Sequence, residues 1–136
     1  MLRSFFLSLF VCLLGAACKD STGPNAGAVG TWRLQTVDGH GLPYTLEQSG
    51  QFKMDLTSEV MTLEASGRVT MVTTFFVTDP PNNPFSESVP DEGTYLVNGS
   101  TISFTFPSDG STPSATVSGD MMTLEDMGLT FVYRRD

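Results

Sequence analysis

The chain has 136 residues and a formal net charge of −8, with 7 Lys and Arg against 15 Asp and Glu. Nucleic acids and anionic lipid headgroups are bound by clustered Lys and Arg, so this balance argues against both as binding surfaces. The length that remains beyond the N-terminal segment is enough for one small domain.

The N-terminus has the three parts of a secretion signal. Arg3 supplies a positive charge, residues 5–14 form an apolar run, and small residues lead up to Cys18. The alternative is a transmembrane anchor, but that needs ~20 apolar residues to cross a ~30 Å hydrocarbon core. We therefore predict that residues 1–17 are a signal peptide.

Residues Leu14-Gly15-Ala16-Ala17-Cys18 resemble the lipobox of bacterial lipoproteins, although Gly15 stands where that motif usually has a branched apolar residue. The resemblance implies that Cys18 is acylated, for example with palmitate, and becomes the first residue of the mature chain. Two acyl chains suffice for stable membrane anchoring. The alternative for this one remaining cysteine is a free exported thiol. Because Lys19 rather than Asp follows the cysteine, the expected location is the bacterial cell envelope at the outer membrane.

Residues 18–29 are polar, contain Gly and Pro and lack periodicity, which predicts a flexible tether. From Gly30 to Asp136 apolar and polar residues alternate, β-branched and aromatic residues are frequent, and no stretch has helical periodicity. This pattern predicts an all-β domain. Its eight strands are expected at residues 30–37, 51–64, 68–78, 92–97, 100–106, 113–118, 121–125 and 129–135.

Tight turns are expected at residues 65–67, at Asn98-Gly99 and at Gly119-Asp120, and they alternate along the chain with longer connections. In an up-and-down meander alternate turns lie at the same end. One end is therefore expected to be closed by tight turns and the other to be ringed by longer connections. Closing eight strands removes the sheet edges and leaves an interior that side chains fill or that holds one small ligand.

The expected register brings apolar residues opposite one another. The predicted pairs are Met61 with Met71, Leu63 with Val69, Gly93 with Phe104, Tyr95 with Ile102, Ala115 with Leu124, and Val117 with Met122. In the second strand Met54 and Leu56 have the opposite parity from Met61. A β-bulge near Thr57 and Ser58 would place all of them on one face.

Two short motifs resemble those of lipocalin-like proteins. Gly30-Thr31-Trp32 is similar to the Gly-x-Trp of the family's first strand, and Phe131-Val132-Tyr133-Arg134 is similar to its last strand. The resemblance implies a small eight-stranded antiparallel up-and-down barrel in which an arginine packs over Trp32 at the closed end. Arg134 is the first candidate and Arg135 the second, since the alternation places Tyr133 inside. The eight-strand count, Trp32 at the closed end and the Met and Phe interior lead to the hypothesis that the barrel binds a small hydrophobic molecule.

The inward positions of the predicted strands carry many Met and Phe residues. Methionine provides an adaptable lining for an apolar ligand, but it also fills gaps in ordinary cores, and both interpretations remain open. The candidate lining residues are Leu34, Met54, Met61, Met71, Phe75, Tyr95, Phe104, Met122 and Phe131.

The sequence offers little for catalysis. His40 could act as a general base oriented by Asp38, but no nucleophile motif accompanies it, and we interpret it as a solvated loop residue. The acidic pairs 91–92 and 125–126 are interpreted as solvated strand ends without metal-site spacing. We expect no enzyme activity, no metal and no cofactor. The alternative to ligand binding is an envelope interaction module that contacts a partner through its long loops, including Phe85 in the Pro-rich loop 79–86.

Overall fold

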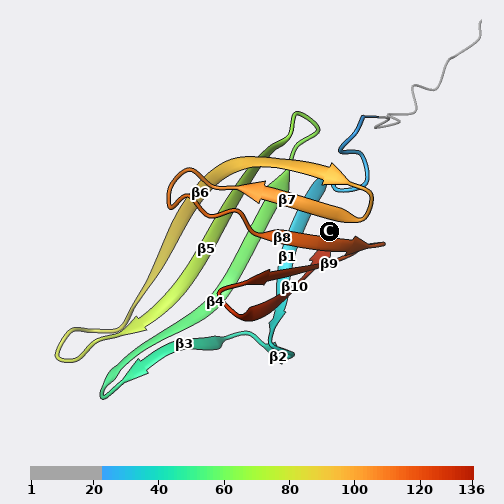
Figure 1. Cartoon of the computed structure of the whole chain (residues 1–136). Coiled ribbons are helices and arrows are strands. Elements are labelled where there is room, and N and C mark those ends of the chain that lie inside the picture. The colour runs from blue at the N-terminus through green and yellow to red at the C-terminus, as the bar shows by residue number, and fades with distance from the viewer. Residues whose placement is uncertain (1–22) are drawn as a thin grey trace, which may run out of the picture.

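The computed structural model describes residues 23–136, which contain ten β-strands and no helix (Figure 1). The strands are β1 (Gly30–Val37), β2 (His40–Gly41), β3 (Tyr44–Ser49), β4 (Phe52–Leu63), β5 (Arg68–Thr78), β6 (Phe85–Asn98), β7 (Thr101–Thr105), β8 (Ser114–Ser118), β9 (Met121–Asp126) and β10 (Leu129–Arg135).

Eight of these strands close into an antiparallel barrel, as the sequence predicts. Neighbours along the chain pair from β4 to β10, and β1 closes the ring by pairing with β10 on one side and with β4 on the other. Closure satisfies the backbone hydrogen-bonding groups that an open sheet would leave at its two edges. The predicted pairing of the first strand with the last is therefore confirmed.

The connection expected at residues 38–50 contains two further short strands. β1 pairs with β4 only over Val60–Leu63, and β3 pairs with the other part of β4, from Phe52 to Leu56. β2 pairs with the end of β1. Both strands lie outside the ring of eight, and β3 extends the sheet where β1 has turned away from β4.

The fourth predicted strand is longer than expected. Alternation predicted residues 92–97, but β6 begins at Phe85, which pairs with Val77 of β5 rather than lying in a loop. The first half of β6 pairs with β5 alone, because β7 pairs only with Thr94–Asn98. In Figure 1, β4, β5 and β6 accordingly extend, together with β3, well past the other strands at one end of the barrel.

The predicted bulge in β4 is present. The register between β4 and β5 shifts between Leu56 and Ser58, and the Thr57 hydroxyl donates a hydrogen bond to the Thr74 carbonyl at 2.9 Å. Leu56 and Met61 have opposite parity along β4. The extra residue at the shift places both of them on the inward face of the strand.

Two of the three predicted turn registers are confirmed, and one is wrong. The pairs across residues 65–67 and across Gly119-Asp120 are as expected. Across the third turn Tyr95 pairs with Phe104 rather than with Ile102, a shift of two residues that preserves the faces. The reason is that Asn98 pairs with Thr101, so the two-residue loop is Gly99-Ser100 and not Asn98-Gly99.

The end of the barrel with these three tight turns, called the closed end below, is sealed by Trp32 and Arg135. Trp32 is fully buried, and its Nε1 donates to the Ala28 carbonyl at 2.8 Å. The Arg135 guanidinium lies 4.4 Å from the centre of the Trp32 ring. The first choice of Arg134 was therefore wrong: alternation along β10 turns Tyr133 and Arg135 inward and leaves Arg134 exposed.

Part of the predicted tether packs against the barrel. Asn25 and Ala28 are buried, and Arg135 donates to the Gly27 carbonyl at 2.9 Å and to the Val29 carbonyl at 3.1 Å. The domain therefore includes residues 23–29, and the expectation of a flexible segment was wrong for them. The predicted signal peptide and Cys18 lie outside the described residues.

Candidate functional site

A cavity of about 320 Å³ lies at the end of the barrel opposite the closed end, called the open end below. This volume is at the lower limit of the range that small-molecule sites occupy, ~300–1,000 Å³. Its wall is formed by inward side chains of the barrel strands and by residues of the open-end connections. The lining residues are Leu46, Leu56, Glu59, Met61, Met71, Thr73, Phe75, Asp91, Phe106, Asp109, Ser111, Pro113, Leu124, Asp126, Met127, Phe131 and Tyr133.

The structure divides the predicted lining residues into two groups. Four of them line the cavity: Met61, Met71, Phe75 and Phe131. The others do not, and most of them fill the core below it, namely Leu34, Tyr95, Phe104 and Met122, while Met54 is half-buried on β4. The two interpretations of the inward Met and Phe residues therefore hold for different layers of one barrel: packed core toward the closed end and cavity wall toward the open end.

Glu59 is a half-buried carboxylate in this wall. It lies on the inward face of β4, two residues before the buried Met61. The Thr73 hydroxyl of β5 donates to its Oε2 at 2.8 Å, and the Tyr133 hydroxyl of β10 donates to its Oε1 in a short hydrogen bond. Its two oxygens are thus held by neutral donors from two other strands.

Burial changes the acidity of both partners in this contact. Loss of solvent raises the pKa of Glu59 above its usual value of 4.5, and the hydrogen bonds from Tyr133 and Thr73 oppose this only in part. Burial, followed by the nearby Glu59 charge, raises the pKa of Tyr133 well above 10. Tyr133 is therefore a hydrogen-bond donor throughout the neutral range.

Three further carboxylates line the cavity. Asp91 is on β6, Asp126 ends β9, and Asp109 belongs to the connection between β7 and β8. Hydrogen bonds from Ser111 lower the pKa of Asp109. The pairs 91–92 and 125–126 are thus not simply solvated strand ends, because one member of each faces the cavity and the other, Glu92 or Glu125, is exposed.

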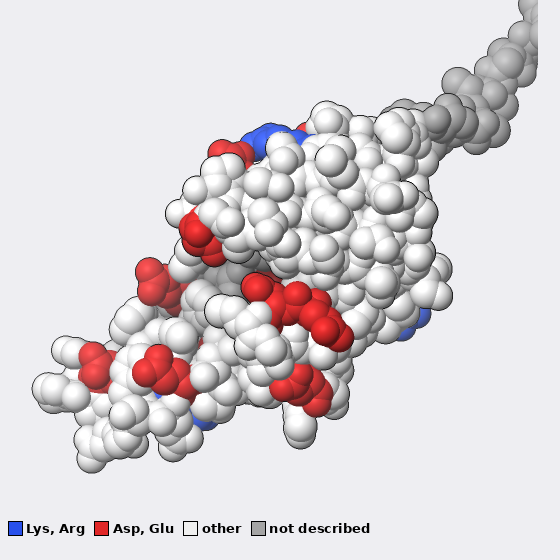
Figure 2. Space-filling view, in the orientation of Figure 1, with Lys and Arg blue, Asp and Glu red and all other residues white. Residues whose placement is uncertain are grey.

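The basic side chains of the described residues lie elsewhere. No Lys, Arg or His of residues 23–136 lines the cavity. Arg33 pairs with Asp136, Lys53 with Asp55, and Arg135 with Asp120. On the face shown in Figure 2, acidic side chains predominate and basic ones appear only at the margins.

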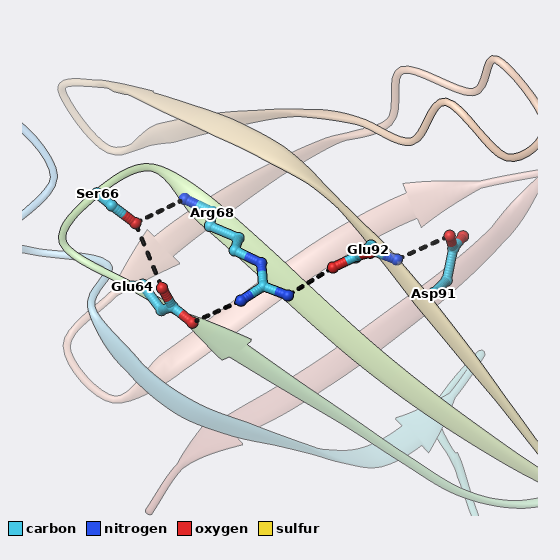
Figure 3. A network of polar contacts seen from close by, with 5 residues as sticks. All are labelled: Glu64, Ser66, Arg68, Asp91 and Glu92. Atoms are coloured by element: carbon cyan, nitrogen blue, oxygen red, sulfur yellow. Dashed lines mark hydrogen bonds and ion pairs between the residues drawn. The ribbon is translucent and has the colours of Figure 1, made fainter.

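Arg68 is likewise engaged in ion pairs outside the cavity. It donates to Glu92 Oε2 at 2.5 Å and lies 3.6 Å from Glu64 Oε1, with Ser66 bridging Glu64 and the Arg68 backbone (Figure 3). Asp91, at the end of this network, accepts only from the Glu92 backbone and from the Ser108 hydroxyl. Within residues 23–136 it therefore has no cationic partner.

The candidate base His40 has no catalytic neighbourhood among the described residues. It is exposed on β2, and its nearest aromatic neighbour is Tyr44, with ring centres 6.4 Å apart. Asp38, the proposed orienting residue, accepts instead from the Thr130 backbone at 2.8 Å. Within residues 23–136 no group of three or more His, Cys, Asp or Glu is placed to hold a metal ion, and no helix there is long and apolar enough to span a membrane.

Sequence reasoning missed Glu59, although a signal was present. The predicted bulge places Met61 and Leu63 inside the barrel, and the same period of two places Glu59 inside as well. A charged residue at a predicted inward position is informative because carboxylates are rarely buried without a specific partner. Asp91 could have been found in the same way from Tyr95, had the full length of β6 been recognised.

The closed eight-stranded antiparallel ring, with a packed core toward one end and a cavity at the other, places the protein among the small antiparallel β-barrels. A family model described as a lipocalin-like domain matches residues 29–128. The chain therefore belongs to the lipocalin-like domain family, as its motifs indicate. No curated protein and no solved structure matches it.

Proposed function

We propose that this protein is a lipid-anchored lipocalin-like barrel of the bacterial cell envelope that binds a small, largely apolar molecule at its open end, without catalysis. The observation that supports binding is the cavity of about 320 Å³ above a packed core. A barrel that serves only as a scaffold needs no such space, because side chains can fill an eight-stranded barrel completely.

The wall suits an apolar ligand. Its lining includes the methionine and aromatic side chains of Met61, Met71, Phe75, Phe106 and Phe131. Methionine side chains adapt to ligands of different shape, and aromatic rings provide large contact areas at low entropic cost. Binding through such a wall is driven by the burial of apolar surface, at about 25 cal/mol per Å².

Titration calorimetry with 1-octanol tests this proposal. The protein is taken from Gly23 onward, because the closed barrel, its core and the residues over Trp32 all lie within that part. We expect saturable binding to the wild type and loss of binding in Met71→Trp, whose larger side chain fills the cavity. The matched control is Val72→Trp, on the exposed outer face of the same strand, which should bind like the wild type.

Two results contradict the proposal. Absence of saturable octanol binding to the wild type would remove the cavity as an apolar site. Equal binding by Met71→Trp and wild type, with both barrels folded by circular dichroism, would place the bound octanol outside the cavity.

The lipid anchor is supported by the sequence around Cys18. Mass analysis of the mature protein from a bacterial host should find Cys18 as the first residue with two or three acyl chains attached. Cys18→Ser should yield protein without acyl chains and outside the membrane fraction. An unmodified Cys18 in the secreted protein would contradict this part of the proposal.

A second candidate function is an interaction module, favoured by exposed apolar side chains on the long β5–β6 hairpin. Val72, Phe76, Phe85 and Val89 are each more than a third exposed. Exposed apolar surface of this kind often marks a contact with another protein. A partner recovered by cross-linking with the wild type but lost with Phe85→Ser, while octanol binding persists, would support this function over the first.

A further inference from the structure

We propose that the cavity is selective for an organic cation, namely a molecule with an apolar body and a protonated amine that pairs with Glu59. This inference rests on the proposed ligand-binding function and deepens it by naming the charge of the ligand. Four features of the cavity carry it: its volume, its apolar wall, the position of Glu59, and the distribution of charge over the molecule.

Charge is distributed one-sidedly around the cavity. Glu59, Asp91, Asp109 and Asp126 come from four separate segments and all face the same space, while the Lys and Arg residues described above are placed outside it. Carboxylates with low-dielectric walls between them focus a negative potential into a cavity. A neutral ligand makes no use of this field, an anion is repelled by it, and a cation is attracted.

Glu59 provides the position at which such a cation would pair. Its oxygens accept one hydrogen bond each from Thr73 and Tyr133, and a carboxylate can accept about four in all. Both present donors are neutral, so the burial of this side chain is not compensated by an opposite charge. An ammonium group in the cavity would provide that charge and a charge-assisted hydrogen bond, which is about twice as strong as a neutral one.

The walls next to Glu59 suit the rest of such a ligand. The aromatic rings of Phe75, Phe106, Phe131 and Tyr133 line the same cavity, and the faces of aromatic rings attract cations within about 6 Å. Met71 and Leu56 add apolar contact beyond them. An amine with one apolar chain or ring system therefore matches both the charge and the surface of this cavity.

Matched head groups on one chain test the inference. Octylamine, 1-octanol and octanoate share an apolar body and differ in charge at pH 7.5, and their affinities for the protein from Gly23 onward are compared by calorimetry. We expect octylamine to bind about tenfold more tightly than octanol, the ratio produced by about 1.4 kcal/mol of head-group discrimination, with octanoate weakest. In Glu59→Gln the amine-to-alcohol affinity ratio should fall toward one.

Glu125→Gln is the matched control. Glu125 adjoins Asp126 on β9 and carries the same charge, but its side chain is exposed and does not line the cavity. This variant should keep the wild-type amine-to-alcohol ratio. If the amine-to-alcohol affinity ratio falls equally in Glu59→Gln and Glu125→Gln, the preference comes from net charge and not from Glu59, and the proposal is overturned.

The outcomes separate this inference from the proposed function. If octanol binds and octylamine binds no more tightly, the cation preference is wrong and the apolar site stands. If octanoate binds most tightly, the sign of the inferred ligand charge is wrong. If none of the three probes binds, the ligand-binding function itself fails together with this inference.

Discussion

Glu59 links the ligand cavity to the stability of the barrel. A half-buried carboxyl whose pKa is raised in the folded state holds its proton to higher pH there than in the unfolded chain. The folded state then binds more protons than the unfolded state between the ordinary pKa of 4.5 and the raised value. In that window the free energy of unfolding falls as pH rises.

This linkage predicts the effect of Glu59→Gln on stability. The amide has no charge to bury, so the variant should gain stability relative to the wild type as pH rises from 4 toward 8. Each unit by which folding raises the pKa of Glu59 adds about 1.4 kcal/mol to this relative gain in the free energy of unfolding. Urea unfolding of both proteins at pH 4 and pH 8 measures it. If the free energies of unfolding of the two proteins differ by the same amount at pH 4 and pH 8, the raised pKa of Glu59 is contradicted.

Arg135 is the second residue whose contacts predict a large effect. Besides its position over Trp32, it donates to the carbonyls of Gly27, Val29 and Gly119. Arg135→Ala should lower the free energy of unfolding by about 2–4 kcal/mol, because hydrogen bonds from charged groups contribute ~1.5–3 kcal/mol and the cation–π contact ~0.5–2 kcal/mol, in part compensated by water.

The neighbouring Arg134 provides the comparison for this measurement. It is exposed, and Arg134→Ala should change stability by no more than about 0.5 kcal/mol. Arg135→Lys should recover only part of the loss, because an ammonium lacks the planar fork that reaches several carbonyls. Equal urea midpoints for Arg134→Ala and Arg135→Ala would show that the closed end does not depend on this contact.

At the scale of strands, Gly93 is the point where β6 leaves the barrel. An added Cβ there would lie 2.1 Å from the Thr105 carbonyl oxygen and 3.1 Å from the Phe106 ring. A backbone atom this close cannot move aside cheaply. Gly93→Ala should therefore destabilise the protein by about 1–3 kcal/mol or more, measured by thermal or urea unfolding.

Gly99 separates this steric effect from the general effect of replacing glycine. It has a positive φ of 63° in the tight turn after β6, and nothing lies within 4 Å of its would-be Cβ. Gly99→Ala should cost only the backbone strain of about 1–2 kcal/mol. A smaller loss for Gly93→Ala than for Gly99→Ala would mean that β6 and Thr105 are not in close contact.

The elements also show which parts of this fold the sequence determines locally. The eight barrel strands and the β4 bulge were predictable because apolar alternation and its change of parity are visible in a single strand. The first half of β6 was not, since Ser86, Ser88 and Pro90 are poor strand formers that pair with β5 only through tertiary context. The register error at Gly99 arose because Asn-Gly favours a loop that the neighbouring strands place one residue later.

The site was predictable in its location but not in its chemistry. Tight and long connections alternate along the chain, which correctly predicted a closed end and an open end. Some inward Met and Phe residues pack in the core and others border the cavity. The difference depends on how β4, β5 and β6 extend past the barrel. The alternation of apolar and polar residues predicts which side chains point inward, but not where along the barrel axis the packed core ends and the cavity begins. Met122 and Met71 therefore looked equivalent.

At the scale of the whole molecule, the closed end is the part of the barrel that the chain reaches first after the proposed lipid anchor. Gly23 begins the segment that packs over Trp32, and it is only five positions after Cys18 in the sequence. Five residues reach at most about 18 Å when fully extended. An acylated Cys18 would therefore hold the closed end near the membrane surface and leave the cavity at the far end of the barrel, open to the surrounding solution.

This arrangement predicts a difference between two labelled positions in membranes. Ser100 is exposed in a closed-end turn, and Asn83 is exposed in the connection beyond β5 at the other end. If residues 1–17 are removed and Cys18 is acylated, as proposed, the mature chain has no free thiol, so Ser100→Cys and Asn83→Cys can each carry one fluorophore. In vesicles with quencher-labelled headgroups, the label at position 100 should be quenched more strongly. Equal quenching would mean that the barrel lies on its side, and stronger quenching at position 83 would mean that the open end faces the lipid and takes its ligand from the membrane.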